Sequence, residues 1–142
     1  MDENLNVLNE VHKGLVMGME SIYVVSSKVG DQNFKQVLDK QYTQYGDILD
    51  RVNNKFSEYG KTASDTSPMQ RVMGWSDIQF STMMDKSNSK ISDMLIRGTT
   101  MGIIEGRKLL NQNLNLDNDV RQILDDFVKE QEHDVEKLKQ WL

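Results

Sequence analysis

The sequence predicts an all-α protein, a four-helix bundle with an additional helix in its long middle connection. Apolar residues recur near the helical period of about 3.6 residues through four long stretches, and no β-type alternation of convincing length interrupts them. The 142 residues include one proline, the strongest helix breaker, and many good helix formers. This length is typical of one domain that can bury a proper core. We therefore expect residues 1–142 to form a single domain.

The first pair of helices is expected within Leu5–Tyr59. Gly30 ends the first helix, and Asp31 is a suitable N-cap for the second. Gly60 follows the second helix as a C-terminal cap. The expected core faces are Leu8, His12, Leu15, Val16, Met19, Ile22 and Tyr23 in the first helix, and Phe34, Leu38, Gln41, Tyr45, Leu49, Val52 and Phe56 in the second.

The second pair is expected within Ser89–Leu142, with Asp117 opening the last helix. In the connection, Ser67 and Pro68 are an N-cap followed by proline at the first helical position, which predicts a crossover helix. The expected apolar positions are Met69, Val72, Met73, Trp75, Phe80, Met83 and Met84 in the crossover helix, Ile91, Met94, Leu95, Gly98, Met101, Gly102, Glu105 and Leu109 in the third long helix, and Val120, Leu124, Phe127, Gln131, Val135, Leu138 and Leu142 in the last.

Composition excludes several classes of function. A net charge of −5 and the lack of a basic stripe argue against a nucleic-acid binder. The chain has no cysteine, which excludes disulfides, thiolate zinc sites and cysteine nucleophiles. No apolar run approaches the roughly 20 residues of a membrane span, and the acidic N-terminus does not resemble a signal peptide. We expect a cytoplasmic protein that does not insert into membranes.

Five short segments carry a family resemblance: Leu8–Glu10 and Gly18–Tyr23 in the first long helix, Tyr45–Leu49 in the second, Gly102–Gly106 in the third and Glu130–His133 in the last. They resemble the bacterial ferritin-like and rubrerythrin-like superfamily. They are similar above all to small ferritin-like domain families of unassigned function, and the resemblance spans essentially the whole chain. It implies a ferritin-like bundle with one long crossover.

The resemblance also implies a candidate metal site. Iron-binding members use a glutamate from each of two helices and a Glu-x-x-His from each of the other two. Carried over by chain order, the metal ligands would be Glu20, Glu105, Glu130 and His133. The second helix should supply another Glu-x-x-His, but its central turns carry Gln41, Tyr42, Gln44 and Tyr45. Half of the ligand set is therefore missing.

The helical period also argues against the other half of the ligand set. If the core face of the last helix is centred on Gln131, His133 lies roughly 200° away on the solvent side. Gln131 points toward the core, Asp134 points toward it from a position further from the centre of the face, and Glu130 lies at the flank of the face. We therefore expect a degenerate di-iron site and no cofactor, with iron or another divalent metal as the alternative.

A buried polar cluster is expected instead. His12 and Glu105 lie on predicted apolar faces, and a buried carboxylate needs a partner or a proton. The cluster comprises His12, Tyr45, Glu105 and Gln131, with Tyr23, Arg97 and Arg107 as further possible partners of Glu105. The functional alternative is a residual metal or ligand site formed by the same residues.

Gly98, Gly102 and Gly106 recur at four-residue spacing, as do Gly14 and Gly18. Each glycine costs a helix about 1 kcal/mol relative to alanine, so we expect another helix to approach closely there. We expect the two glycine runs to face each other, and the alternative is space for a small ligand beside Glu105. The nine methionines indicate flexible core filling, with Cu(I) binding as the alternative.

These observations favour a non-catalytic bundle that acts through self-association, as a homodimer or larger homo-oligomer, or through protein partners. The chain has no glycine-flanked serine elbow and no phosphate-binding loop. The alternatives are a rubrerythrin-type metal-binding protein or oxidoreductase using Glu20, Glu105, Glu130 and His133, and a carrier of a small ligand.

Overall fold

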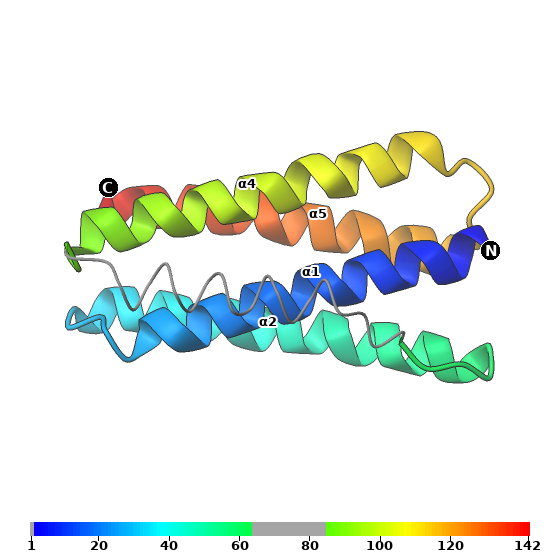
Figure 1. Cartoon of the computed structure of the whole chain (residues 1–142), viewed down its shortest axis with the longest axis horizontal. Helices are drawn as coiled ribbons and strands as arrows, with labels where there is room; N and C mark the ends of the chain where they lie inside the picture. The colour runs from blue at the N-terminus through cyan, green and yellow to red at the C-terminus, as the bar shows by residue number, and fades with distance from the viewer. Residues whose placement is uncertain (1, 64–84) are drawn as a thin grey trace.

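A computed structural model describes residues 2–63 and 85–142. Four long helices lie side by side (Figure 1), with the bounds α1 Glu3–Ser26, α2 Gln32–Glu58, α4 Asn88–Gln112 and α5 Asn118–Leu138, followed by a short 3₁₀ helix, η1 Lys139–Trp141. The predicted all-α four-helix bundle is confirmed. The crossover helix predicted from Ser67 onward, with Trp75, lies outside the described residues.

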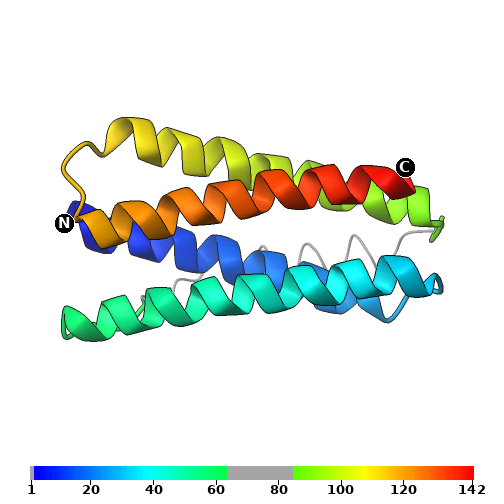
Figure 2. The same cartoon turned by 180° about the vertical axis from the view of Figure 1, so that it is seen from behind.

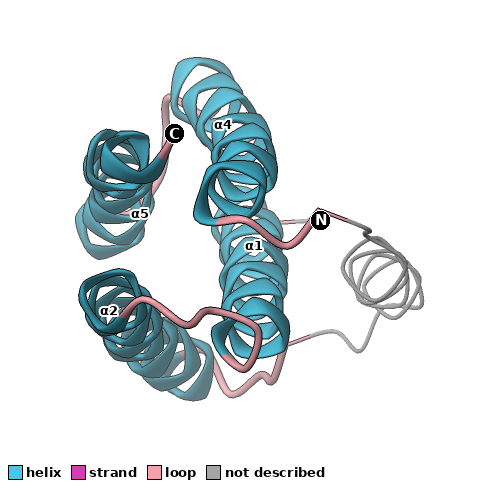
Figure 3. Cartoon of the chain, turned by 90° about the vertical axis from the view of Figure 1, so that its left-hand side faces the viewer, coloured by secondary structure: helices cyan, strands magenta, loops and turns pink. Residues whose placement is uncertain are grey.

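The helices form two antiparallel pairs, α1 with α2 and α4 with α5, as both side views show (Figures 1 and 2). Viewed from the end, α4 lies beside α1, and α5 lies beside α2 (Figure 3). α2 ends at one end of the bundle and α4 begins at the other (Figure 1). No helix of the described residues is long and apolar enough to cross a lipid bilayer.

Two of three helix-boundary residues predicted from the sequence act as caps. The Asp31 carboxylate accepts the backbone N–H of Phe34 at 3.0 Å, as predicted for an N-cap. Gly60, directly after α2, has a φ of +68°, a left-handed conformation that favours glycine at a C-terminal cap. Asp117 precedes α5 as expected, but its side chain makes no capping bond. It accepts the Tyr59 hydroxyl instead, which ties α5 to the end of α2.

The core follows the predicted face of α2 closely and those of α1 and α5 with one error each. Leu142, expected on the apolar face of the last helix, is 62% exposed. Tyr23 is 70% exposed, so its predicted core position is wrong. The neighbouring Ile22 is buried, and Val25 rather than Tyr23 continues the buried face one turn later. Residues one position apart point about 100° apart on a helix, and with Ile22 facing the core Tyr23 points to solvent.

Trp141 packs against the start of α2. Its ring stacks on the buried Phe34 with centroids 4.7 Å apart and planes 11° apart. We expect Trp141→Ala to lower the free energy of unfolding by about 1–2 kcal/mol, because it removes this stacking and exposes Phe34. Urea unfolding measures the change. Leu142→Ala, at an exposed neighbour, is the control; equal losses in both variants would contradict the packing role.

Candidate functional site

The centre of the bundle contains polar side chains from α2 and α5. Gln41, Tyr45, Gln131 and Asp134 are 4%, 5%, 4% and 1% exposed, respectively. Glu130 is partly buried and turns one carboxyl oxygen, Oε2, into the interior. We call these five residues the interior polar layer. Two come from α2 and three from α5, which lie next to each other in the bundle.

Glycines of the two facing helices make room for the interior polar layer. A Cβ atom on Gly18 of α1 would lie 2.9 Å from the Tyr45 ring. A Cβ on Gly102 of α4 would clash with the side-chain oxygen of Gln131. Side chains from α2 and α5 therefore occupy the space beside α1 and α4 that side chains of those helices would otherwise fill.

Several atoms of the interior polar layer lack hydrogen-bond partners. These atoms are Nε2 of Gln41, Oε2 of Glu130, Nε2 of Gln131 and both carboxyl oxygens of Asp134. A buried polar group without a partner costs about 1–3 kcal/mol, and a buried charge costs more. Burying Asp134 in its charged form would therefore be costly, and the neutral, protonated form is favoured.

Burial, and to a lesser extent the adjacent Glu130 carboxyl, together raise the pKa of Asp134 to about 9. Glu130 and Tyr45 lie close enough to Asp134 to affect its ionisation, although neither makes a hydrogen bond of normal geometry with it. Burial and the Asp134 carboxyl likewise raise the pKa of Tyr45 well above its usual value. At neutral pH Asp134 is therefore protonated and Tyr45 is a neutral phenol.

The interior polar layer does not fit a two-metal centre. Such a centre needs several anionic ligands that converge from different helices. Here the two carboxyl groups, Glu130 and Asp134, both come from α5, and one carries a proton. Where α1 and α4 could supply a glutamate, Gly18 and Gly102 cradle neighbouring side chains. Within residues 2–63 and 85–142, no three His, Asp or Glu residues are grouped as a metal site would require.

The structure separates the members of the polar cluster proposed from the sequence. Tyr45 and Gln131 are buried in the interior polar layer, whereas the Glu105 side chain is 71% exposed and pairs with Lys108 at 3.5 Å. The predicted inward position of Glu105 is wrong. His12 is partly buried, and burial lowers its pKa. It precedes Gly18, the glycine that contacts Tyr45, by six residues on α1. His12 therefore lies about 9 Å along the helix from the position of Tyr45.

The alternative metal ligands are also dispersed. Glu105 and His133 are exposed, while Glu20 and Glu130 are partly buried. His133 lies on the solvent side of α5, as its helical position indicated, beside a shallow depression that Ile103 also lines. No three of these four residues form a group that could hold a metal ion. The set implied by the family resemblance is therefore not gathered in this chain.

The glycine runs do not face each other, contrary to the expectation. Gly14 receives the Phe127 ring, whose Cζ would lie 2.7 Å from an added Cβ, and Gly18 receives Tyr45. Gly106 receives Val128, with a methyl carbon 2.6 Å from an added Cβ. These glycines accommodate side chains of α2 and α5 rather than another helix backbone. The space expected for a small ligand beside Glu105 is filled around Gly102 and Gly106.

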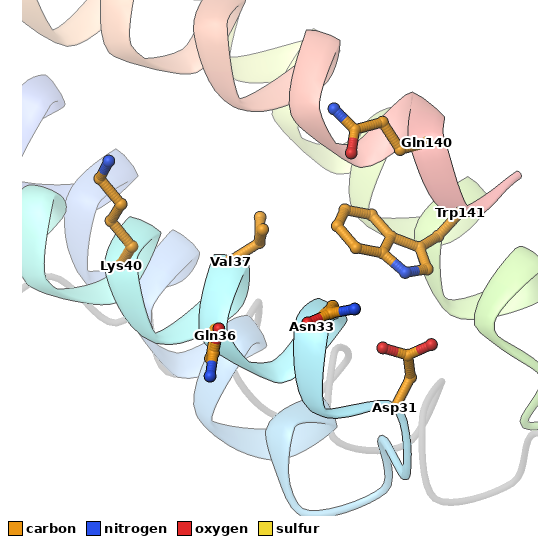
Figure 4. Close-up of a pocket in the computed structure, with 7 residues that line it drawn as sticks. All are labelled: Asp31, Asn33, Gln36, Val37, Lys40, Gln140 and Trp141. Carbon is orange, nitrogen blue, oxygen red and sulfur yellow. The ribbon is translucent and has the colours of Figure 1, made fainter.

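A second candidate site lies at the surface near the chain's end. Figure 4 shows Gln140 and Trp141 on one side of this pocket and residues of α2, with Asp31, on the other. The pocket has a volume of about 590 Å³ but is shallow and wide open. Asp31 already caps α2 and Trp141 already stacks on Phe34, so two of its lining residues have structural roles. The interior polar layer, with its buried carboxyl groups, is therefore a stronger candidate site than this pocket.

Two antiparallel helix pairs, with α2 ending and α4 beginning at opposite ends, form a ferritin-like four-helix bundle. A solved structure with this fold is the dodecameric thioferritin described as the bacterioferritin-related protein from Bacteroides fragilis. It matches with a TM-score of 0.77 and 10% sequence identity over 99% of this chain and 86% of that chain. No protein-family model and no curated protein matches the sequence. The structural likeness therefore establishes the fold alone.

Proposed function

We propose that this chain is a non-catalytic subunit of a homo-oligomer with the ferritin-like fold, and that it acts through self-association. The observation that carries the proposal is an apolar surface on α4, where Met101 is 68% exposed and Ile104 is 49% exposed. Large apolar groups exposed side by side mark association surfaces. We call this surface, with the residues that flank it, the α4 outer face: Met94, Arg97, Gly98, Met101, Ile104, Glu105 and Lys108.

Two further observations support the proposal. The ferritin-like neighbour is a dodecamer according to its description, and its fold matches nearly all of this chain. The interior polar layer holds side chains where a two-metal centre would need converging carboxylates, which favours a structural role over redox chemistry.

Sedimentation of the whole chain tests the proposal. One chain has a mass of 16.4 kDa, and we expect a weight-average mass above this value that falls on dilution. Met101→Glu should shift the distribution toward the single chain, because it places a charge in an apolar contact.

Leu114→Glu is the matched control, since Leu114 is 76% exposed in the loop between α4 and α5. This control should associate as the natural chain does. A mass of one chain at every concentration would overturn the proposed function. Equal dissociation of both variants would show that the α4 outer face is not the surface involved.

A further inference from the structure

Gly98 has no role inside the described part of the chain. An added Cβ at Gly98 would meet no atom within 4 Å, whereas each of the other glycines of α1 and α4 receives a side chain there. A glycine in a helix interior costs about 1 kcal/mol relative to alanine. Gly98 is exposed and lies on the α4 outer face, beside Met101. The notch that it leaves therefore opens toward whatever covers that face.

The α4 outer face has the geometry of a helix-pairing seam. Its positions form two series with alternating steps of three and four residues, 94–97–101–104–108 and 94–98–101–105–108. At about 100° per residue all of them lie within about 60° of Met101. Such spacing lets one helix insert side chains between those of a second helix. The face runs from Met94 to Lys108, about 21 Å along the helix axis.

An antiparallel second copy complements this seam. When two copies of α4 run in opposite directions about a twofold axis at Met101, Ile104 lies at the same height along the seam as Gly98 of the partner subunit, on the opposite flank. At the next level, Glu105 meets Arg97 of the partner subunit. Each contact occurs twice because the pairing is symmetric. A parallel pairing would instead bring Arg97, Glu105 and Lys108 against their own copies, with like charges together.

We propose that two copies of this chain pair through their α4 outer faces, antiparallel and centred on Met101. This inference rests on the proposed self-association and specifies its surface and register. A contact between two helices is small compared with the roughly 1,200–2,000 Å² of stable interfaces, so this dimer is weak, with a dissociation constant in about the micromolar range or above. Further contacts elsewhere on the bundle build any larger assembly.

Disulfide trapping tests the register directly, because the chain contains no cysteine. In Met101→Cys the two thiols meet at the twofold axis, where their Cα atoms come within the roughly 7 Å that a disulfide permits. We expect mild oxidation to convert most of this variant to a covalent dimer at micromolar concentration. Tyr23→Cys and Leu114→Cys, at positions 70% and 76% exposed and off the seam, should remain mostly uncrosslinked.

Charge reversal tests the pairing of Arg97 with Glu105 of the partner subunit. Glu105→Arg places two arginines at the same level twice and should weaken association at least about tenfold. Adding Arg97→Glu restores opposite charges across the seam and should recover the natural affinity. Both side chains are exposed, with Arg97 78% and Glu105 71% accessible, so the variants should keep the fold.

The outcomes separate this pairing from the broader proposal. If the natural chain associates but Met101→Cys crosslinks no faster than the two controls, the antiparallel pairing is wrong while self-association stands. Failure of Arg97→Glu to rescue Glu105→Arg also overturns the register. A natural chain that sediments as a single copy at every concentration overturns both proposals together.

Discussion

Replacing Asp134 with asparagine is expected to make the bundle more stable at neutral pH and to remove most of the decline in stability between pH 5 and pH 8. The buried carboxyl of Asp134 has its pKa raised from 3.8 to about 9 by burial and by Glu130. The folded chain therefore keeps a proton that the unfolded chain releases. Asparagine keeps nearly the same shape, carries no ionisable proton and leaves no charge to bury.

The sign of the pH dependence follows from proton binding. Between pH 3.8 and about 9 the folded state binds more protons at Asp134 than the unfolded state does. Stability therefore falls as pH rises through this window, by up to about 1.4 kcal/mol per pH unit. The contribution is fully present below the unfolded pKa and is lost as pH passes the folded pKa.

Urea unfolding of both chains at several pH values between 5 and 8 measures the effect. The difference in unfolding free energy, variant minus natural chain, should grow steadily with pH. Asp39→Asn is the matched control, since Asp39 lies on the exposed side of α2 and its replacement leaves the interior unchanged. A constant difference between Asp134→Asn and the natural chain would show that Asp134 is ionised in the folded protein.

Alanine at two glycines of the bundle should have opposite effects. Gly14→Ala places a methyl group 2.7 Å from Cζ of Phe127, a rigid ring that is itself buried, and overpacking of this kind costs about 1–3 kcal/mol. Gly98→Ala meets no atom of the described chain and should raise the stability of the single chain by about 1 kcal/mol through helix propensity. The two variants are expected to differ by about 2 kcal/mol or more.

Thermal unfolding in dilute solution, where the single chain predominates, provides this comparison. Gly98→Leu extends the test to the α4 outer face. It places a large side chain in the notch on the proposed seam, so it should weaken association while leaving the single chain folded. If both alanine variants changed stability in the same direction, the packing assigned to Gly14 or the openness assigned to Gly98 would be incorrect.

The helices themselves could be predicted because their signals are local. Asp31 and Gly60 mark helix boundaries through capping chemistry, and the apolar faces of α2 and α5 are strongly one-sided. The orientation of α4 was harder to predict. Apolar residues lie on several sides of this helix, as Met101, Ile103 and Ile104 show. The helical period therefore did not identify which side is buried, and Glu105 was assigned to the core in error.

The interior polar layer was only partly predictable. Gln131 stood out as a polar residue at the centre of an apolar face, and Asp134 was expected to turn inward less squarely. The contribution of Glu130, and the cradling of Tyr45 and Gln131 by Gly18 and Gly102, depend on how four helices pack together. The period of one helix does not show which glycine of another helix its side chains will pack against.

Elemental analysis of the whole chain after expression with added iron, manganese and zinc tests the account of the bundle centre most directly. We expect well below one bound metal ion per chain, with no change in Asp134→Asn, because two carboxyl groups on α5 do not replace the ligands of a two-metal centre. Two metal ions per chain, lost in Asp134→Asn, would contradict the account and establish the interior polar layer as a metal site.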